Sequence, residues 1–270
     1  MKKHFFIVLA GIMLWSTAVY LTACKKTSSV EDTGFATEHA TAEQTFSDIL
    51  DITDQASESN SLSTFKTTSQ CASITRDTIA VPHTITINFG TTNCLCSDGK
   101  YRRGTILVSY TGKYKDSGST HTITFSNYFV NNNQVIGTKT VTNMGLNANN
   151  QIYCTVNTNA SIILASGAGT IQVSGSKTRT WITGYATTTK TDDSYNVTGS
   201  WIVTRPNGTQ VTHLITKGLS IARSCNWIKE GTVQVTVPNG TIRIIDYGNG
   251  ACDNQATLTN NGVVTTITLP

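Results

Sequence analysis

From about residue 67 to the C-terminus, apolar and polar side chains alternate along the chain with a period of two. The segment 84–89 shows the pattern clearly, because Ile85, Ile87 and Phe89 are separated by Thr and Asn. Such alternation predicts a strand with one buried face. Similar runs occur at 105–110, 122–126, 138–143, 151–156, 161–164, 170–173, 178–183, 196–204, 210–216, 232–237, 241–247 and 262–269. The apolar and Thr/Ser/Asn faces favour antiparallel sheets with one face in water.

Turn signals separate several of these runs. Pro206-Asn207-Gly208, Pro238-Asn239-Gly240 and Asn260-Asn261-Gly262 each lie between alternating segments, and Asn-Gly suits the two positive φ angles of a type I′ hairpin turn. No intervening stretch has the roughly ten helical residues that a parallel crossover needs. We therefore predict an all-β fold, an antiparallel β-meander forming an open curved barrel or a sandwich.

One segment before the strands has helical spacing instead. Thr41 and Gln44 fit a capping box, and the apolar stripe that follows consists of Ala42, Phe46, Ile49, Leu50 and Thr53. This pattern predicts one short N-terminal helix at about 42–56. We expect it to cover an open end or an apolar face of the sheet; the alternative is an amphipathic helix that binds a partner.

The N-terminus has the pattern of an export signal. A basic head at 1–4 and an apolar run at 5–20 precede Leu21-Thr22-Ala23-Cys24, which resembles a bacterial lipoprotein lipobox. On that resemblance Cys24 carries the lipid; an uncleaved membrane helix is the alternative. We expect a signal peptide at 1–23, a flexible tether at 24–40, and one all-β domain at 41–270.

The composition excludes one class of partner. Charged residues make up 13% of the chain, with 20 Lys and Arg against 16 Asp and Glu. A nucleic-acid-binding protein needs a clustered basic surface. We therefore expect no nucleic-acid partner.

The cysteines favour disulfides. Six of the seven remain when Cys24 is set aside, and an even number in an exported chain favours pairing over metal thiolates. Two segments echo each other, since Phe89-Gly90 and Tyr247-Gly248 each precede a cysteine with three residues between. This echo pairs Cys225 with Cys252 and Cys71 with Cys94, and leaves Cys96 for Cys154 by elimination. Chance alternation in a Thr-rich chain is the alternative explanation of the echo.

Several features together resemble uncharacterised exported lipoproteins of Bacteroidota. They are the lipobox, a helix after a polar tether, a Cys-framed hairpin that continues into 98–104, and a C-terminal segment at 247–254. The resemblance implies an all-β body in the cell envelope, anchored to the outer membrane and facing either the periplasm or the surface. It implies no activity and no cofactor.

Catalytic and metal-binding patterns are weak. The histidines at 39, 83, 121 and 213 lack metal-ligand spacing, so we expect solvated histidines on strands. A glycosidase needs two neighbouring carboxylates, and the candidates are Asp192, Asp193, Glu230 and Asp246. The pair Asp192-Asp193 lies in a polar hairpin tip where acids normally face water. We expect no enzyme and no cofactor.

Trp181, Trp201 and Trp227 are expected in consecutive late strands. Exposed together on a sheet they would stack on sugar rings; otherwise they fill the core. We expect a cell-envelope lipoprotein with a non-enzymatic structural or interaction role, bound to the membrane through lipid on Cys24. The alternative is a ligand-binding module that holds a glycan or an apolar ligand on the concave face of the sheet. A protein ligand also stays open.

Overall fold

A computed structural model of the chain describes residues 33–58, 71–187, 189 and 191–269. Gly34–Pro270 forms one compact unit. Cys24, the predicted signal peptide, residues 24–32 of the expected tether and residues 67–70 lie outside the described part of the chain.

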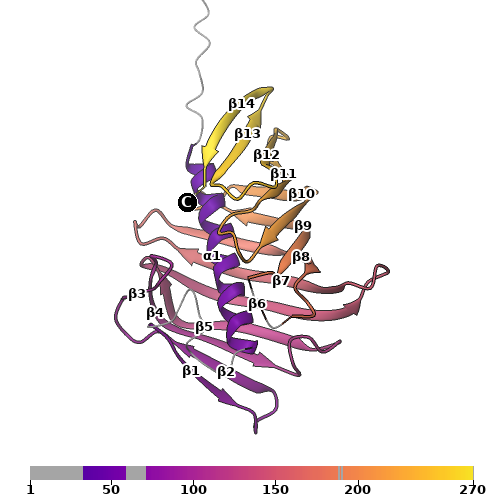
Figure 1. Cartoon of the computed structure of the whole chain (residues 1–270). Coiled ribbons are helices and arrows are strands. Elements are labelled where there is room, and N and C mark those ends of the chain that lie inside the picture. Colours follow the sequence, from indigo (N-terminus) through magenta and orange to yellow (C-terminus); the bar gives the residue numbers. More distant parts are fainter. Residues whose placement is uncertain (1–32, 59–70, 188, 190, 270) are drawn as a thin grey trace, which may run out of the picture. The chain divides into compact units, whose positions relative to one another are not determined.

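One long helix precedes fourteen strands (Figure 1). The helix is α1 (Thr33–Glu58). The strands are β1 (Ser73–Asp77), β2 (His83–Asn88), β3 (Cys94–Leu95), β4 (Tyr101–Tyr110), β5 (Thr120–Val130), β6 (Asn133–Leu146), β7 (Ile152–Ile163), β8 (Thr170–Thr183), β9 (Ser194–Thr204), β10 (Gln210–Ala222), β11 (Glu230–Thr236), β12 (Ile242–Asn249), β13 (Gln255–Asn260) and β14 (Val263–Thr268).

The strands form a single antiparallel sheet in chain order. Each strand pairs with the next one in the chain, with one exception: β2 pairs with β4 and not with the short β3. The strand β3 pairs only with β4 and lies outside the sequential order of the other strands. The sheet is open, with β1 and β14 at its two edges. The predicted all-β meander with one N-terminal helix is therefore confirmed, as one open sheet.

Burial alternates along the strands as the sequence pattern predicts. In β7, Ile152, Cys154 and Val156 are buried while the residues between them are partly exposed. We call the buried side the inner face. Figure 1 shows α1 running across the strands, and its apolar residues share one buried core with the inner face: Ala42, Phe46, Ile49, Leu50, Ile52 and Ala56. Burying each large apolar side chain contributes roughly 1.5–3 kcal/mol.

The helix begins earlier than the sequence pattern predicts. It starts at Thr33 and ends at Glu58, so residues 33–40 are helical and not part of a tether. Contacts with the sheet account for the extra turns: Glu38 forms an ion pair with Arg205, and the ring of His39 stacks on that of His213. Tertiary contacts commonly override weak local propensity.

Two of the three Asn-Gly turns differ from the predicted type. Asn261 and Gly262 both have positive φ, at 49° and 80°, as a type I′ turn requires. At 206–208 and 238–240 only the glycine has positive φ. Its N–H bonds the carbonyl three residues back, as in Gly208 N to Arg205 O at 2.9 Å. The proline fixes a negative φ and so favours a type I turn followed by a left-handed glycine.

The inner face is more polar than the alternation predicts. His39, His121 and His213 are buried, with 5%, 3% and 0% of their surfaces exposed, so the expectation of solvated histidines is wrong for these three. Lys139 and Arg179 are buried on the same side. Buried polar groups need partners, and α1 supplies carboxylates and a carbonyl group to them.

The outer face has the opposite character. The five strands β5 to β9 contain only three charged residues, Lys139, Lys177 and Arg179. All three point inward to α1, where they contact Phe46 O, Glu43 and Asp54 respectively. The outer face of these strands therefore carries no charged side chain and is composed mainly of Thr, Ser and Asn.

Candidate functional site beneath the helix

Ion pairs connect α1 to the sheet along most of its length. We call the participating residues the ionic seam: Glu38, Glu43, Asp48 and Asp54 on α1, with Lys100, Arg102, Lys177, Arg179, Arg205 and Arg223 on or beside the strands. Glu43 meets Lys177 at 2.7 Å, and Asp48 pairs with Lys100. The acids lie on the helix and the bases on the sheet, so the seam holds the two elements together by charge.

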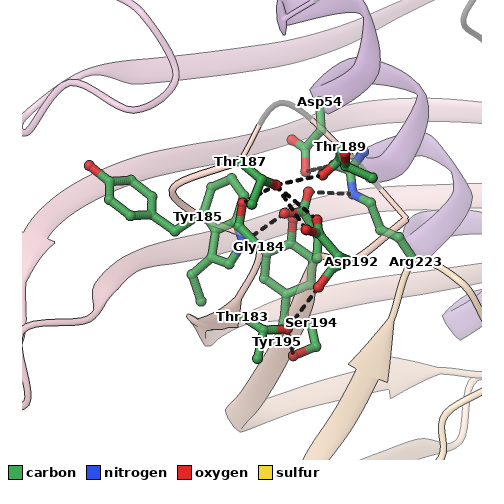
Figure 2. Close-up of polar contacts among 12 residues, drawn as sticks. Asp54, Thr183, Gly184, Tyr185, Thr187, Thr189, Asp192, Ser194, Tyr195 and Arg223 are labelled. Carbon is green, nitrogen blue, oxygen red and sulfur yellow. Dashed lines mark hydrogen bonds and ion pairs between the residues drawn. The ribbon is translucent and has the colours of Figure 1, made fainter.

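Asp54 is the most enclosed acid of the seam, with 1% of its surface exposed. Its Oδ2 accepts a hydrogen bond of 2.6 Å from Arg179 Nη2 and one of 3.3 Å from Arg223 Nη2. Arg179 also donates to the hydroxyl of Tyr114. Two guanidinium groups from different parts of the sheet therefore converge on one carboxylate near the C-terminal end of α1, and Figure 2 shows Arg223 beside Asp54.

A second carboxylate lies beside Arg223 on the sheet side. Asp193 is 1% exposed and its Oδ2 lies 3.6 Å from Arg223 Nε. Its Oδ1 accepts a hydrogen bond of 3.1 Å from Trp181 Nε1. The expectation that Asp192 and Asp193 both face water is therefore wrong for Asp193.

The loop between β8 and β9 explains the different positions of the two acids. Gly184 adopts a φ of +84°, and the chain turns back so that Thr183 Oγ1 donates to Asp192 O at 2.7 Å. Asp192 stays exposed and accepts a hydrogen bond of 2.9 Å from Thr187 Oγ1 (Figure 2). The loop thus directs Asp193 inward toward Arg223.

Burial changes the pKa values of the groups around the seam. Although burial opposes a charged guanidinium, Asp54 holds the pKa of Arg179 well above its ordinary value. Burial raises the pKa of Asp51 to about 6, aided by repulsion from Asp54 and opposed by Arg223. Burial also raises the pKa of Asp48, against the opposing attraction of Lys100. The arginines of the seam therefore stay positively charged and surround several carboxylates of α1.

Near the N-terminal end of α1, three aromatic rings pack together between the helix and the sheet. His213 contacts both Trp201 and His39, with ring centroids 4.8 and 4.7 Å away and interplanar angles of 12° and 8°, and the rings of His39 and Trp201 are themselves 6.2 Å apart. Burial lowers the pKa of His39 to about 4 and that of His213 to about 2. Both imidazoles are therefore neutral at pH 7, as stacking in an apolar environment requires.

A buried lysine contacts the middle of the helix. Lys139 Nζ donates a hydrogen bond of 2.7 Å to the backbone carbonyl of Phe46. Burial lowers the pKa of Lys139 to about 7, and the neighbouring Lys177 lowers it further in the same direction. The amine of Lys139 thus connects the sheet to the backbone of α1 as a hydrogen-bond donor.

The three tryptophans do not share an exposed face. Trp181 and Trp201 are buried on the inner face, with 5% and 3% of their surfaces exposed, and Trp227 is partly exposed between β10 and β11. Lys177 Nζ lies 3.7 Å from the Trp201 ring centroid, where the helix covers it. Trp201 also contacts His39 of α1, and Trp181 packs against Tyr185 and Tyr195, so neither buried ring forms an exposed stacking surface.

Two of the expected disulfides are present. Cys71 and Cys94 are bonded with their Cα atoms 5.6 Å apart, and Cys225 and Cys252 with theirs 5.7 Å apart. Each closes a hairpin-sized loop. The third expected pair is wrong, because Cys96 and Cys154 are free and buried.

Topology separates these two thiols. Cys96 follows β3, and β4, β5 and β6 lie between β3 and β7, which carries Cys154. Strands are about 4.8 Å apart, whereas a disulfide needs Cα atoms within about 7 Å. The pairing of Cys96 with Cys154, which was predicted by elimination, therefore joined two residues that lie several strands apart in the sheet.

The carboxylates considered for hydrolysis have other contacts. Glu230 forms an exposed ion pair of 2.7 Å with Lys217, and Asp246 Oδ1 accepts a hydrogen bond of 2.8 Å from Gly248 N. Among the described residues, no group of three or more His, Cys, Asp or Glu side chains is arranged to hold a metal ion.

A hollow of about 280 Å³ lies on the outer face, opposite the helix. It is lined by Asn159, Ser161, Gln172, Val173, Ser174, Ile202, Thr204 and Gln210. Most of these residues form two neighbouring cross-strand rows. One row is Asn159, Ser174 and Ile202, and the other is Ser161, Gln172, Thr204 and Gln210. The small Ser174 between longer neighbours leaves the space, and the lining offers amides and hydroxyls without any charge.

Within the described ranges, no helix is long and apolar enough to span a membrane. Comparison with known proteins gives no match for this chain among family models, curated proteins or solved structures.

Proposed function

We propose that the chain is a lipid-anchored protein of the cell envelope with a non-enzymatic structural or interaction role. Lipid on Cys24 would attach it to the outer membrane, facing the periplasm or the surface. The observation that carries the proposal is the ionic seam. Residues 25–32 alone separate Cys24 from the first residue of α1, and α1 is fixed to the sheet by ion pairs from Glu38 to Asp54.

The seam gives the anchor a firm attachment to the folded body. A helix held only by an apolar stripe can slide along it, whereas charge pairs at several positions fix its register. Force on the lipid would thus pass through α1 to strands from β4 to β10. The charged groups of the inner face are engaged in this role, and the uncharged outer face of β5 to β9 is free to meet a partner.

Membrane fractionation tests the anchor. The full chain, expressed in a bacterium with an outer membrane, is expected in the membrane fraction, and Cys24→Ser in the soluble fraction. Cys96→Ser is the matched control, because it removes a buried free thiol and leaves the lipobox intact. An intact Cys225–Cys252 disulfide in each variant reports that the body has folded. Persistence of Cys24→Ser in the membrane fraction would contradict the anchor.

A second candidate function is binding of a neutral ligand in the outer hollow. The expected ligand position on the concave side is filled by α1, whereas the hollow offers about 280 Å³, close to the lower limit of small-molecule sites. Its amides and hydroxyls both donate and accept hydrogen bonds. This lining suits an uncharged, hydroxyl-rich molecule such as a glycan segment, with Ile202 as an apolar contact.

Calorimetry with defined sugars tests this second candidate. The purified full chain is titrated with maltotetraose and with diacetylchitobiose. Ser174→Phe fills the hollow and is expected to abolish binding, while Thr140→Phe adds the same ring on the same face outside the hollow and is expected to leave binding unchanged. Equal binding by the two variants, or none by the parent protein, would contradict the candidate.

A further inference from the structure

The last strand of the sheet has an open edge. β14 pairs with β13 on one side, and among the described residues no strand pairs with its other side. Five of its six residues are exposed, with Val263 at 64% and Val264 at 63%. Unpaired backbone groups on an exposed edge are a template for another strand.

The turn before β14 determines which backbone groups face outward. Asn261 and Gly262 form a two-residue type I′ turn, so Asn260 and Val263 are a hydrogen-bonded pair. Hydrogen-bonded and outward-facing residues alternate along an antiparallel strand. Val263, Thr265 and Ile267 therefore bond β13, and the N–H and C=O groups of three other residues point to solvent: Val264, Thr266 and Thr268.

The composition of β14 favours pairing. All six residues are β-branched, and the strand contains no charge and no proline. These are the residues with the strongest preference for strands, and charge and proline are the usual means of protecting an edge. The opposite edge differs, because β1 carries Arg76 and Asp77 within five residues.

We propose that β14 pairs antiparallel with β14 of a second copy of this chain, about a two-fold axis through Thr266. Thr266 is the central outward-facing residue, so this register sets it opposite its own copy and sets Val264 opposite Thr268. The three residue pairs exchange six backbone hydrogen bonds. Such an interface extends the sheet across two copies and goes beyond the proposed anchor role.

The side chains are compatible with this symmetry. Residues directly opposite each other in an antiparallel pair point to the same face, so Thr265 meets Ile267 on the inner side and Thr266 meets Thr266 on the outer side. No like charges meet anywhere along the six residues. An identical strand is therefore a suitable partner. The contact is smaller than the roughly 1,200–2,000 Å² of stable interfaces, so the dimer should be reversible.

Sedimentation equilibrium of the purified full chain in density-matched detergent tests the dimer. We expect a mass that rises from one to two copies with concentration. Thr266→Lys places like charges opposite each other and should hold the protein at one copy over the same range. Thr75→Lys is the matched control on the other edge strand and should behave as the parent protein.

Cross-linking tests the register. Oxidised Thr266→Cys should form a covalent dimer on a non-reducing gel, because opposite residues of a hydrogen-bonded pair have Cα atoms about 5.5 Å apart, within disulfide range. A mixture of Val264→Cys and Thr268→Cys chains should form a mixed dimer. The proposal is overturned by a parent protein that stays at one copy, by open-ended oligomers that Thr75→Lys abolishes, or by absence of the Thr266→Cys dimer.

Discussion

Arg179 on β8 donates a hydrogen bond of 2.6 Å to Asp54 on α1, although the two residues are 125 positions apart in the chain. Arg223 contacts the same carboxylate from 169 positions away. The contact fixes the C-terminal half of the helix to the middle of the sheet, and several properties of the protein follow from it.

Loss of the Asp54 carboxylate should strongly destabilise the fold. Asp54→Ala leaves two buried guanidinium groups without their shared partner, and breaking a buried ion pair in this way costs roughly 3–5 kcal/mol. Urea denaturation should show this loss in the free energy of unfolding. Glu230→Ala breaks an exposed ion pair and should cost no more than about 1 kcal/mol. Equal losses in the two variants would contradict the structural importance of Asp54.

The stacked histidines should make the fold sensitive to acid. Burial lowers the pKa of His39 to about 4 and that of His213 to about 2, so between these values and 6.5 the unfolded chain binds more protons than the folded one. The two neutral imidazoles therefore contribute their full stabilisation above pH 6.5, and the free energy of unfolding decreases as the pH falls below 6.5.

The variant His213→Phe tests this prediction because it keeps an aromatic ring beside Trp201 without a titrating group. The free energy of unfolding, measured from pH 8 to pH 4, should fall less steeply for His213→Phe than for the parent protein. Thr140→Phe, which adds an aromatic ring on the outer face without removing a titrating group, should follow the parent slope. Parallel curves for His213→Phe and the parent would refute the role of His213.

Asp51 should have the opposite pH dependence. Its pKa rises from 3.8 to about 6 on folding, so the folded state binds more protons in this window and loses stability as the pH rises through it. At 1.36 kcal/mol per pKa unit the penalty is about 3 kcal/mol at most.

Replacing Asp51 by Asn removes the charge and should therefore raise the free energy of unfolding at pH 7. The gain over the parent protein should shrink as the pH falls from 6 toward 4. Asp253→Asn, at an exposed acid before β13, should change stability by less than about 0.5 kcal/mol. A loss of stability at pH 7 in Asp51→Asn would show that its carboxylate is needed in ionised form.

The two free cysteines should react only after unfolding. Cys96 and Cys154 are buried, and burial raises the pKa of Cys154 to about 11 and also raises that of Cys96. Iodoacetamide reacts with thiolates, so native Cys24→Ser protein should take up no label. Denaturation without reductant should expose two thiols per chain. No labelling after denaturation would indicate the Cys96–Cys154 bond that the strand order excludes.

The sequence predicted the sheet well because its signal is local. A period of two and turn residues suffice to define strands, and the echo between the two Cys-framed hairpins identified both disulfides. The ionic seam was missed because its pairs join residues such as Glu43 and Lys177, 134 positions apart. No local pattern identifies such partners. The start of α1 was missed for the same reason, since contacts with the sheet stabilise its first turns.

The buried polar residues were missed because alternation was taken to mean an apolar interior. His121 was predicted on a solvated strand face and Asp193 in a polar hairpin tip, but both are buried. The period of two gives no indication that α1 and the β8–β9 loop bring polar partners to the inner face. The turn types at 206–208 and 238–240 were, in contrast, predictable from the φ of proline alone.

The helix that binds the inner face is made long before its binding surface is complete. Strands of the meander pair with their sequence neighbours and can form as the chain emerges, but Asp54 contacts Arg223, 169 positions later. During synthesis, the contact between Asp54 and Arg223 can therefore form only after β10 has been made. Until then the acidic and apolar residues of α1 lack some of their partners on the sheet, so the seam makes completion of the fold depend on the late strands of the chain.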